Sequence, residues 1–209
     1  MREGVRSYLH SLYISFITGN LDALSPKILS YHRNVIRVAN GGRLIVDGRL
    51  HLGTCSSGWP GSIYISLGKN SVLHFTGRAS IHADSRIVLS ENARVTIGDH
   101  CVFRDRLWLR AQQEITIGDG TIVGNNTMIT DSDLHLIEIE DKCLPDRKPV
   151  RLEEHVWIGS RCIILKGVNI GKETVIGAGS LVTRNIPDHV LAYGRPASIQ
   201  RKIQHWGAA

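Results

Sequence analysis

The chain places an aliphatic residue at every sixth position through much of its second half. From Ile117 the spacing runs through Val123 to Ile129. It resumes at Ile158 and continues to Val182. An amphipathic helix needs apolar spacings of three and four, and a half-buried strand needs alternation, so neither element alone gives a period of six. A short strand plus a corner, repeated three times per coil, does give it, and it points each aliphatic side chain into a stacked prism. The period therefore predicts an all-β solenoid.

Residues 1–33 follow a different pattern. Their apolar residues recur at helical spacing: Tyr8, Leu9, Leu12, Tyr13, Phe16 and Ile17. Gly19-Asn20 is a typical helix stop. We therefore expect residues 1–33 to form an N-terminal helical cap over one end of the solenoid, because repeat proteins need their open ends covered. A second interpretation is contact with the inner membrane surface, since Arg2 and Arg6 flank the apolar residues.

Residues 34–187 are expected to form the solenoid itself. Apolar spacing is looser than six before about residue 95, which predicts irregular early coils. The register slips by two at Gln112-Gln113, and we interpret the slip as a bulge at one corner. The charged, proline-containing stretch near 136–151 predicts an exposed loop insertion. Glycine often follows the inward aliphatic residue directly, which indicates either a positive φ or a close approach between coils.

Residues 188–209 are expected to form a C-terminal extension. Ile199, Ile203 and Trp206 would share one face of a helix, so the spacing predicts a short helix there.

Composition excludes several classes of protein. A chain of 209 residues is long enough for one well-buried core, and 42% hydrophobic with 21% charged residues is ordinary for a soluble globular protein. The formal charge of +6 suits an anionic ligand. No dense Lys/Arg run appears, which argues against nucleic acid. No apolar stretch of about 18 residues occurs, so we expect a soluble, cytoplasmic protein.

The cysteines and histidines do not indicate a metal. Cys55, Cys101, Cys143 and Cys162 show no metal-ligand spacing, and we expect reduced thiols, with Cys101 and Cys162 buried. No two histidines lie five residues apart, the spacing found in the zinc-dependent carbonic anhydrases of a related fold. The sequence thus predicts no metal.

Two motifs carry a family resemblance. One is the run from Val156-Trp157-Ile158-Gly159-Ser160 through Gly177-Ala178-Gly179-Ser180 to Gly194-Arg195-Pro196-Ala197, and the other is Asp131-Ser132-Asp133-Leu134-His135. Both resemble the hexapeptide-repeat acyltransferases, particularly the sugar and polysaccharide O-acetyltransferases that include galactoside and maltose acetyltransferases. The match covers residues 95–203 well. It implies a left-handed parallel β-helix that assembles as a homotrimer.

The second motif resembles the segment that holds the family's catalytic histidine. A hydroxyl that attacks a thioester needs a base near neutral pH, which imidazole supplies. We therefore predict His135 as the general base. Asp133, Glu138 or a backbone carbonyl would hold its second ring nitrogen, and the sequence does not choose among them.

The resemblance also implies acetyl-CoA as the acyl donor. Ser160, Ala178, Thr183 and Arg201 match the family's coenzyme contacts, and Trp157 resembles its tryptophan beside the coenzyme channel. Small residues would admit the pantetheine arm, and further arginines could pair with phosphates. The full predicted coenzyme set is Trp157, Ser160, Ala178, Gly179, Ser180, Thr183, Arg184, Arg195 and Arg201.

Acceptor recognition departs from the family pattern. Arg104-Asp105-Arg106 stands where these enzymes carry an asparagine that holds the acceptor. The triplet suits a charged acceptor, or it forms a salt-bridged coil edge. Asp131, at the start of the histidine motif, is a further candidate for acceptor contact.

We therefore predict an acetyl-CoA-dependent O-acetyltransferase acting on a saccharide hydroxyl, in surface-polysaccharide or other glycan synthesis. An N-acetyltransferase for an amino sugar or xenobiotic is the enzymatic alternative. A catalytically silent trimeric scaffold is the alternative from another class. The predicted location is cytoplasmic, with peripheral contact to the inner membrane face as an open possibility.

Overall fold

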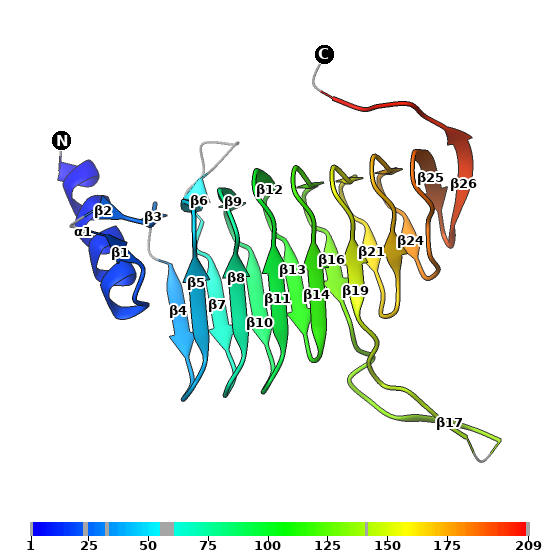
Figure 1. Ribbon diagram of the computed structural model, residues 1–209, viewed down its shortest axis with the longest axis horizontal. Helices are drawn as coiled ribbons and strands as arrows, with labels where there is room; N and C mark the ends of the chain where they lie inside the picture. Colours follow the sequence, from blue (N-terminus) through cyan, green and yellow to red (C-terminus); the bar gives the residue numbers. More distant parts are fainter. Residues whose placement is uncertain (1, 23–24, 32–33, 55–60, 141, 208–209) are drawn as a thin grey trace.

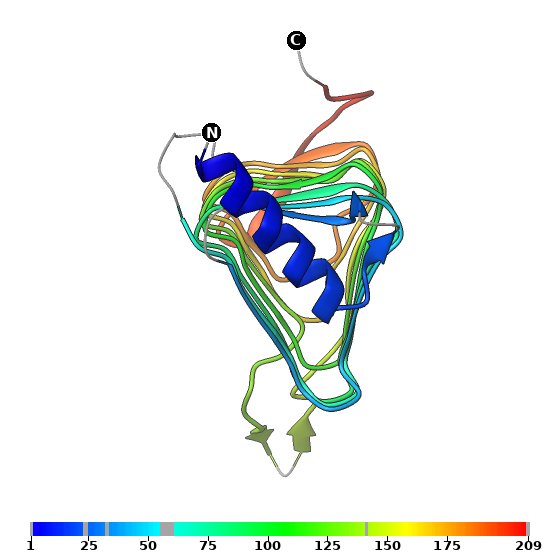
Figure 2. The same cartoon turned by 90° about the vertical axis from the view of Figure 1, so that its left-hand side faces the viewer.

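The chain is a stack of triangular coils with one helix laid across its end (Figures 1 and 2). The computed structural model describes residues 2–22, 25–31, 34–54, 61–140 and 142–207. Cys55 lies outside the described residues. Stacked parallel sheets around a triangular section are typical of a left-handed β-helix, which confirms the predicted fold class.

Three sheets, parallel except for the last strand β26, form the sides of the prism. The nine-stranded sheet consists of β3 (Ile28–Ser30), β6 (Leu50–Thr54), β9 (Ala79–His82), β12 (Cys101–Phe103), β15 (Ile122–Val123), β20 (Trp157–Ile158), β23 (Val175–Ile176), β25 (Val190–Gly194) and β26 (Ala197–Lys202). The seven-stranded sheet consists of β4 (Val35–Val38), β7 (Tyr64–Leu67), β10 (Arg86–Leu89), β13 (Trp108–Ala111), β16 (Met128–Thr130), β21 (Ile163–Ile164) and β24 (Leu181–Val182). The six-stranded sheet consists of β5 (Arg43–Val46), β8 (Val72–Phe75), β11 (Arg94–Ile97), β14 (Glu114–Ile117), β19 (Val150–Leu152) and β22 (Asn169–Ile170).

The chain visits the sheets in that order in each coil, so the prism has three corners. The first corner follows a strand of the nine-stranded sheet, the second follows the seven-stranded sheet, and the third follows the six-stranded sheet. Equivalent corners of successive coils lie above one another, because neighbouring strands pair in register.

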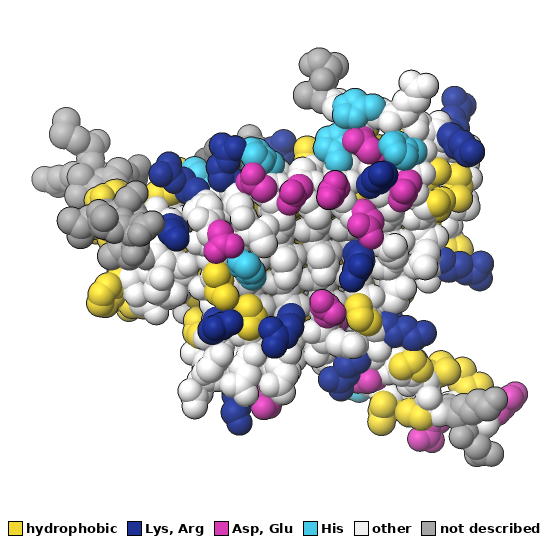
Figure 3. Space-filling view, viewed as in Figure 1, with side chains coloured by type: hydrophobic (Ala, Val, Ile, Leu, Met, Phe, Trp, Pro, Cys, Tyr) yellow, Lys and Arg dark blue, Asp and Glu magenta, His cyan; other side chains and the backbone are white. Residues whose placement is uncertain are grey.

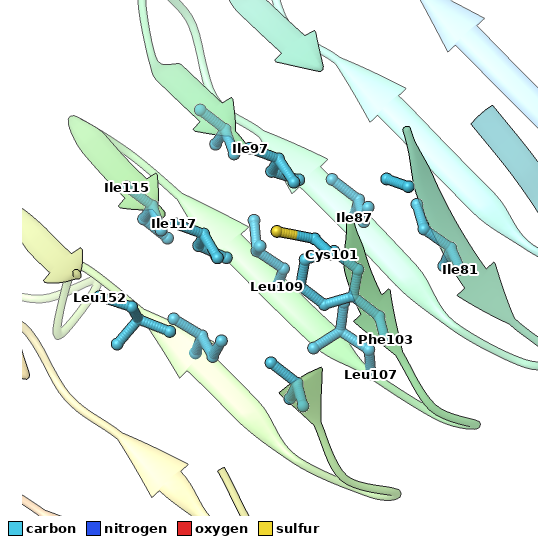
Figure 4. Close-up of a cluster of buried hydrophobic side chains, with 14 of the residues drawn as sticks. Ile81, Ile87, Ile97, Cys101, Phe103, Leu107, Leu109, Ile115, Ile117 and Leu152 are labelled. Atoms are coloured by element: carbon cyan, nitrogen blue, oxygen red, sulfur yellow. The ribbon is translucent and has the colours of Figure 1, made fainter. Parts of the chain in front are cut away.

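The core is a set of aliphatic columns inside the prism (Figure 4). In the seven-stranded sheet, Ile87, Leu109 and Ile129 stack at 0% exposure. The strands show an alternating burial pattern, because side chains on a strand point to opposite faces. Cys101 and Cys162 are buried free thiols, as predicted, and burial raises the pKa of Cys101 to about 12. Cys143 is free and exposed.

The early coils are irregular at their start and regular afterwards. The coil that leads from Val35 to its partner Tyr64 is longer than the coils that follow, and the pairing of β6 with β9 shifts register between Leu52 and Thr54, as the looser spacing predicted. From Tyr64 through Arg86 to Trp108 the partners stack directly, so these successive coils have the same length. The later coil from Ile163 to its partner Leu181 is shorter. The earlier coils have longer strands, often of four residues, which put two inward residues on one strand and hide the period of six.

Glycine after the inward aliphatic residue permits close approach between coils. A Cβ on Gly124 would lie 2.5 Å from the Ser160 nitrogen, and one on Gly159 would lie 2.6 Å from the Ala178 nitrogen. Neither glycine has a positive φ. Of the two explanations for these glycines, close packing of the backbone is therefore correct.

Helix α1 (Arg2–Ile17) caps the N-terminal end of the stack. The Ser15 and Ser11 hydroxyls accept hydrogen bonds from the backbone N–H groups of Ile28 (3.2 Å) and Ser30 (2.8 Å) in the terminal strand β3. A short pair, β1 (Leu21–Asp22) with β2 (Ser25–Pro26), follows the helix. Within the described part of the chain, no helix is long and apolar enough to cross a membrane.

The packing face of α1 differs from the apolar face that the sequence suggested. Ser11, Ile14 and Ser15 are buried against the solenoid. The larger apolar residues Tyr8, Leu9, Tyr13, Phe16 and Ile17 are each at least 50% exposed. Small residues face the solenoid because the helix must come close enough for serine hydroxyls to reach β3.

The predicted C-terminal helix is absent from the described residues. Ala197–Lys202 forms β26, which pairs antiparallel with β25. The chain reverses at Gly194, and the free edge of β25 offers backbone partners that a short solvent-exposed helix would lack. Ile199 is 52% exposed, so the apolar spacing that suggested a helical face marks no buried face.

Candidate functional site

His135 lies on the second corner, where the coil is interrupted between β16 and β19. The interruption is an antiparallel hairpin of β17 (Ile137–Ile139) and β18 (Lys142–Leu144), which projects from the prism (Figures 1 and 2). The predicted exposed insertion near 136–151 is thus a hairpin rather than an irregular loop. His135 is exposed at the base of this hairpin, and within the described residues it has no hydrogen-bond partner.

Asp131 holds this corner together from inside. Its side chain is fully buried, and its carboxylate accepts hydrogen bonds from the backbone N–H groups of Gln112 (2.8 Å), Gln113 (2.7 Å) and Glu114 (2.8 Å). Burial raises the pKa of Asp131 and outweighs the three hydrogen bonds, which lower it. The slip at Gln112-Gln113 is therefore a shortened corner that aims its N–H groups at a carboxylate.

This placement corrects the prediction of acceptor contact for Asp131. The carboxylate is 0% exposed and already accepts three backbone hydrogen bonds, so an acceptor molecule has no access to it in this arrangement. Asp131 instead fixes the start of the segment that carries His135.

Asp133 is paired with a residue that the sequence did not single out. Lys166, one coil further along at the same corner, donates to the Asp133 carboxylate and to the Pro145 carbonyl oxygen (2.8 Å). The backbone N–H of Asp133 also donates to the Asp146 carbonyl oxygen (2.8 Å). Asp133 therefore anchors both ends of the insertion to the next coil. Its bond to Lys166 makes it a support for the corner rather than a partner of the His135 ring in this arrangement.

The first corner carries most of the predicted coenzyme and acceptor residues. Backbone and side-chain bonds link its successive coils: the N–H of Asp105 donates to Asn125 Oδ1 (3.0 Å), and the N–H of Asn125 donates to Ser160 Oγ (3.2 Å). The N–H of Gly179 donates to the Ser160 carbonyl oxygen (2.8 Å). Ala178 is exposed beside it. Ser160 thus occupies the middle of a continuous ladder.

A buried histidine lies beneath the arginine-rich triplet of this corner. His82 is 8% exposed, and its Nδ1 lies 3.8 Å from Asp105 Oδ1. Burial lowers the pKa of His82, Arg104 lowers it further, and Asp105 raises it. Arg104 and Arg106 are exposed on either side. Sequence reasoning does not single out His82, because nothing near it in the sequence indicates its proximity to Asp105.

Ser180 does not belong with the exposed coenzyme candidates. It is fully buried, its hydroxyl donates to the Gly177 carbonyl oxygen (2.6 Å), and it accepts from the Gly194 N–H (3.2 Å). Its hydroxyl is engaged in holding the turn between coils and is not open to a ligand. The approach of the coenzyme to the backbone at this small residue stays a prediction.

The remaining candidates are dispersed over the surface. Thr183 and Arg184 are exposed at the second corner, beyond His135. Trp157, on β20, is 44% exposed. Arg195 and Arg201 are exposed on the C-terminal segment. In one chain, His135 therefore lies on a different corner from Ser160 and Ala178, and no single surface carries the whole predicted set.

Comparison with known proteins gives matches over much of the chain. A family model described as the hexapeptide repeat of succinyl-transferase matches residues 149–184. The galactoside O-acetyltransferase of Lactococcus lactis subsp. lactis (strain IL1403) is 34% identical over 142 residues, which are 67% of this chain and 57% of that protein. The chain thus spans less than two thirds of that relative's length.

Two solved structures share the fold. The polySia-specific acetyltransferase NeuO aligns with a TM-score of 0.60 and 22% identity, covering 84% of this chain and 83% of that one. A variant of AntD, an N-acyltransferase from Bacillus cereus in complex with dTDP-4-amino-4,6-dideoxyglucose and coenzyme A, aligns with a TM-score of 0.55 and 20% identity. That alignment covers 79% of this chain and 86% of AntD.

Proposed function

Since the chain belongs to the hexapeptide-repeat acetyltransferase family, we propose that it transfers the acetyl group of acetyl-CoA to a saccharide hydroxyl. The observation that carries this proposal is an exposed histidine, His135, on a corner whose backbone is held in place by hydrogen bonds to carboxylates. His135 follows Asp131 and Asp133, and both carboxylates tie its segment to neighbouring coils. A fixed imidazole with an open face suits proton transfer from a bound hydroxyl.

The proposed reaction moves one proton and exchanges one bond. His135 accepts the proton of the acceptor hydroxyl while the hydroxyl oxygen bonds to the acetyl carbonyl carbon. The carbon–sulfur bond of the thioester then breaks, and the imidazolium gives its proton to the departing coenzyme A sulfur. The histidine is regenerated, so the residue acts first as base and then as acid.

The first corner has surface features that suit the coenzyme. Ala178 is exposed, and a Cβ built on Gly179 would meet nothing within 4 Å, so the backbone there is open to a narrow pantetheine arm. Arg195 and Arg201 are exposed cations that could pair with its phosphates. The net charge of +6 favours the approach of an anionic coenzyme.

We propose that a complete site needs a second copy of the chain, in line with the predicted trimer. His135 and the small-residue positions lie on separate corners of one prism, so they can meet across an interface between prisms. The hairpin beside His135 supports this, because it exposes Leu136, Ile137, Ile139 and Leu144 at 69%, 44%, 53% and 38%. Apolar residues grouped on a projecting arm are typical of a segment that packs against a partner.

The test is release of free coenzyme A from acetyl-CoA across a panel of saccharide hydroxyl and amino-sugar acceptors. We expect turnover by the wild type and a loss of at least about 100-fold for His135→Ala, the range for removal of a general base. The matched control is His74→Ala, which removes a histidine from β8 and should leave turnover unchanged. Acetyl-CoA binding, measured by calorimetry, should be retained by both variants.

Each contrary result has a definite meaning. Full turnover by His135→Ala would reject this residue as the base. Binding of acetyl-CoA without turnover of any acceptor would reject the saccharide transferase. Absence of acetyl-CoA binding would reject the enzymatic proposal altogether and favour a scaffold. Turnover of amino sugars alone would replace O-acetylation by N-acetylation.

A further inference from the structure

Three potential metal ligands meet on the third corner, away from His135. His155 precedes β20, Glu173 precedes β23 one coil later, and His205 follows β26 near the end of the chain. The Nδ1 atoms of His155 and His205 lie 2.9 Å and 3.1 Å from the same carboxylate oxygen, Oε2 of Glu173. One ligand atom from each residue lies within 4.8 Å of the other two. Figure 3 shows histidine and acidic side chains gathered at this edge near the C-terminus.

The imidazole rings are held in place on both sides. The His155 ring stacks on the His205 ring at 5.2 Å and 6°, and on the Trp206 ring at 4.1 Å and 16°. The Trp206 indole N–H donates to the His155 carbonyl oxygen (2.7 Å). The backbone N–H of Ile203 donates to the His189 carbonyl oxygen (2.8 Å). These contacts fix the C-terminal segment over the corner, so the ligands are already oriented.

We propose that His155, Glu173 and His205 bind a divalent transition-metal ion of the zinc class. Two imidazole nitrogens and one carboxylate oxygen are a known ligand set for zinc, and a water molecule would complete four-coordination. Tetrahedral bonds of roughly 2.0–2.1 Å place neighbouring ligand atoms roughly 3.3 Å apart. The two nitrogen–oxygen distances of 2.9 Å and 3.1 Å are close to that spacing, and the third pair of ligand atoms, the two nitrogens, lies within 4.8 Å.

The ion would stabilise the C-terminal end of the fold. It would join two successive coils to residues 203–207, which otherwise depend on a few backbone bonds and the stacked rings. The corner is separate from the one that carries His135, so the site goes beyond the proposed acetyl transfer. The sequence did not reveal it, because its three ligands are 18 and 32 residues apart and belong to no motif.

The experiment titrates metal-stripped full-length protein with ZnCl2 by calorimetry, and follows the melting temperature and trypsin cleavage after Lys202. We expect one equivalent to bind, the melting temperature to rise with zinc concentration, and cleavage to slow. His205→Ala and Glu173→Gln should each weaken binding at least about tenfold, because each removes one of three ligands. His205 is exposed near the chain end, so its variant should fold.

The control variant is His100→Ala, which removes an exposed histidine from the same corner two coils earlier. It should bind zinc like the wild type. The proposal is overturned if wild-type protein binds no zinc, or if His205→Ala and Glu173→Gln bind it as tightly as wild type. Either result would make the cluster a hydrogen-bonded contact between histidines and a carboxylate.

Discussion

Replacing Asp131 tests whether a buried carboxylate holds the corner that presents His135. Asp131→Ala leaves the N–H groups of Gln112, Gln113 and Glu114 without their acceptor. A hydrogen bond to a charged group contributes about 1.5–3 kcal/mol, so three bonds set an upper limit of about 4–9 kcal/mol. Removing the carboxylate also relieves its desolvation, which costs several kcal/mol in buried ions. Gln113 and Glu114 are exposed, so water can replace part of the loss. We expect a net destabilisation of about 2–4 kcal/mol.

The assay is urea unfolding at pH 7 followed by circular dichroism. Asp119→Ala is the matched control, because the Asp119 carboxylate accepts a single backbone bond, from the Asp99 N–H (2.7 Å), at an exposed corner position. It should cost about 1 kcal/mol. A free energy of unfolding for Asp131→Ala within about 0.5 kcal/mol of the wild type, a change typical of neutral surface positions, would refute the assigned role.

The pH dependence supplies a second check on Asp131. Its pKa is raised in the folded state, so the folded protein binds the proton more tightly than the unfolded chain, whose Asp has a pKa of about 3.9. Stability relative to Asp131→Asn should therefore fall as pH rises from about 4 through the folded pKa, and stay constant above it. A relative stability that rises with pH over this window would mean that the three hydrogen bonds outweigh burial.

Two further predictions concern the packing of one coil on the next and the packing of α1 on the first coil. Gly159→Ala should destabilise the protein by about 2 kcal/mol or more, because its Cβ would lie 2.6 Å from a backbone nitrogen. The control is Gly179→Ala, whose Cβ would meet nothing within 4 Å. Because Gly179 has φ +75°, this substitution should cost about 1 kcal/mol through left-handed backbone strain alone. If thermal melts gave the same loss of stability for both variants, close approach between coils would be contradicted as the reason for Gly159. Ser15→Ala should cost about 1–2 kcal/mol, because the Ile28 N–H loses its acceptor. An exposed-face substitution on the same helix, Tyr13→Ala, should change stability by less than about 0.5 kcal/mol, and a reversal of that order would contradict the capping role.

The sequence predicted the features that repeat, and it missed those that depend on contacts across coils. The spacing of six predicted the β-helix because inward aliphatic residues recur wherever a short strand meets a corner. It did not predict the equal coils from Tyr64 through Arg86 to Trp108, since two inward positions on one strand break that spacing. The C-terminal helix was wrong because apolar spacing does not reveal an unpaired strand edge next to it.

The candidate site shows the same division. The motif around His135 identified the exposed histidine and the corner that holds it. Lys166, Asn125 and His82 contact site residues that lie 20 or more positions away in the sequence, so no local pattern could indicate them. Asp131 was assigned to the acceptor because sequence does not reveal that its side chain is buried. The acceptor, the trimer and the cytoplasmic location stay predictions.

The two ends of the stack are closed by elements that run differently from the coils. At the start, α1 supplies hydroxyls to the N–H groups of β3, and at the finish, β26 runs antiparallel to β25. A parallel β-helix with open ends could add further chains end to end, since each exposed strand is a template for the next. With both terminal parallel strands of the nine-stranded sheet contacted in this way, end-to-end growth through that sheet is opposed, and the three flat sides and their corners remain as surfaces through which copies of the chain can associate.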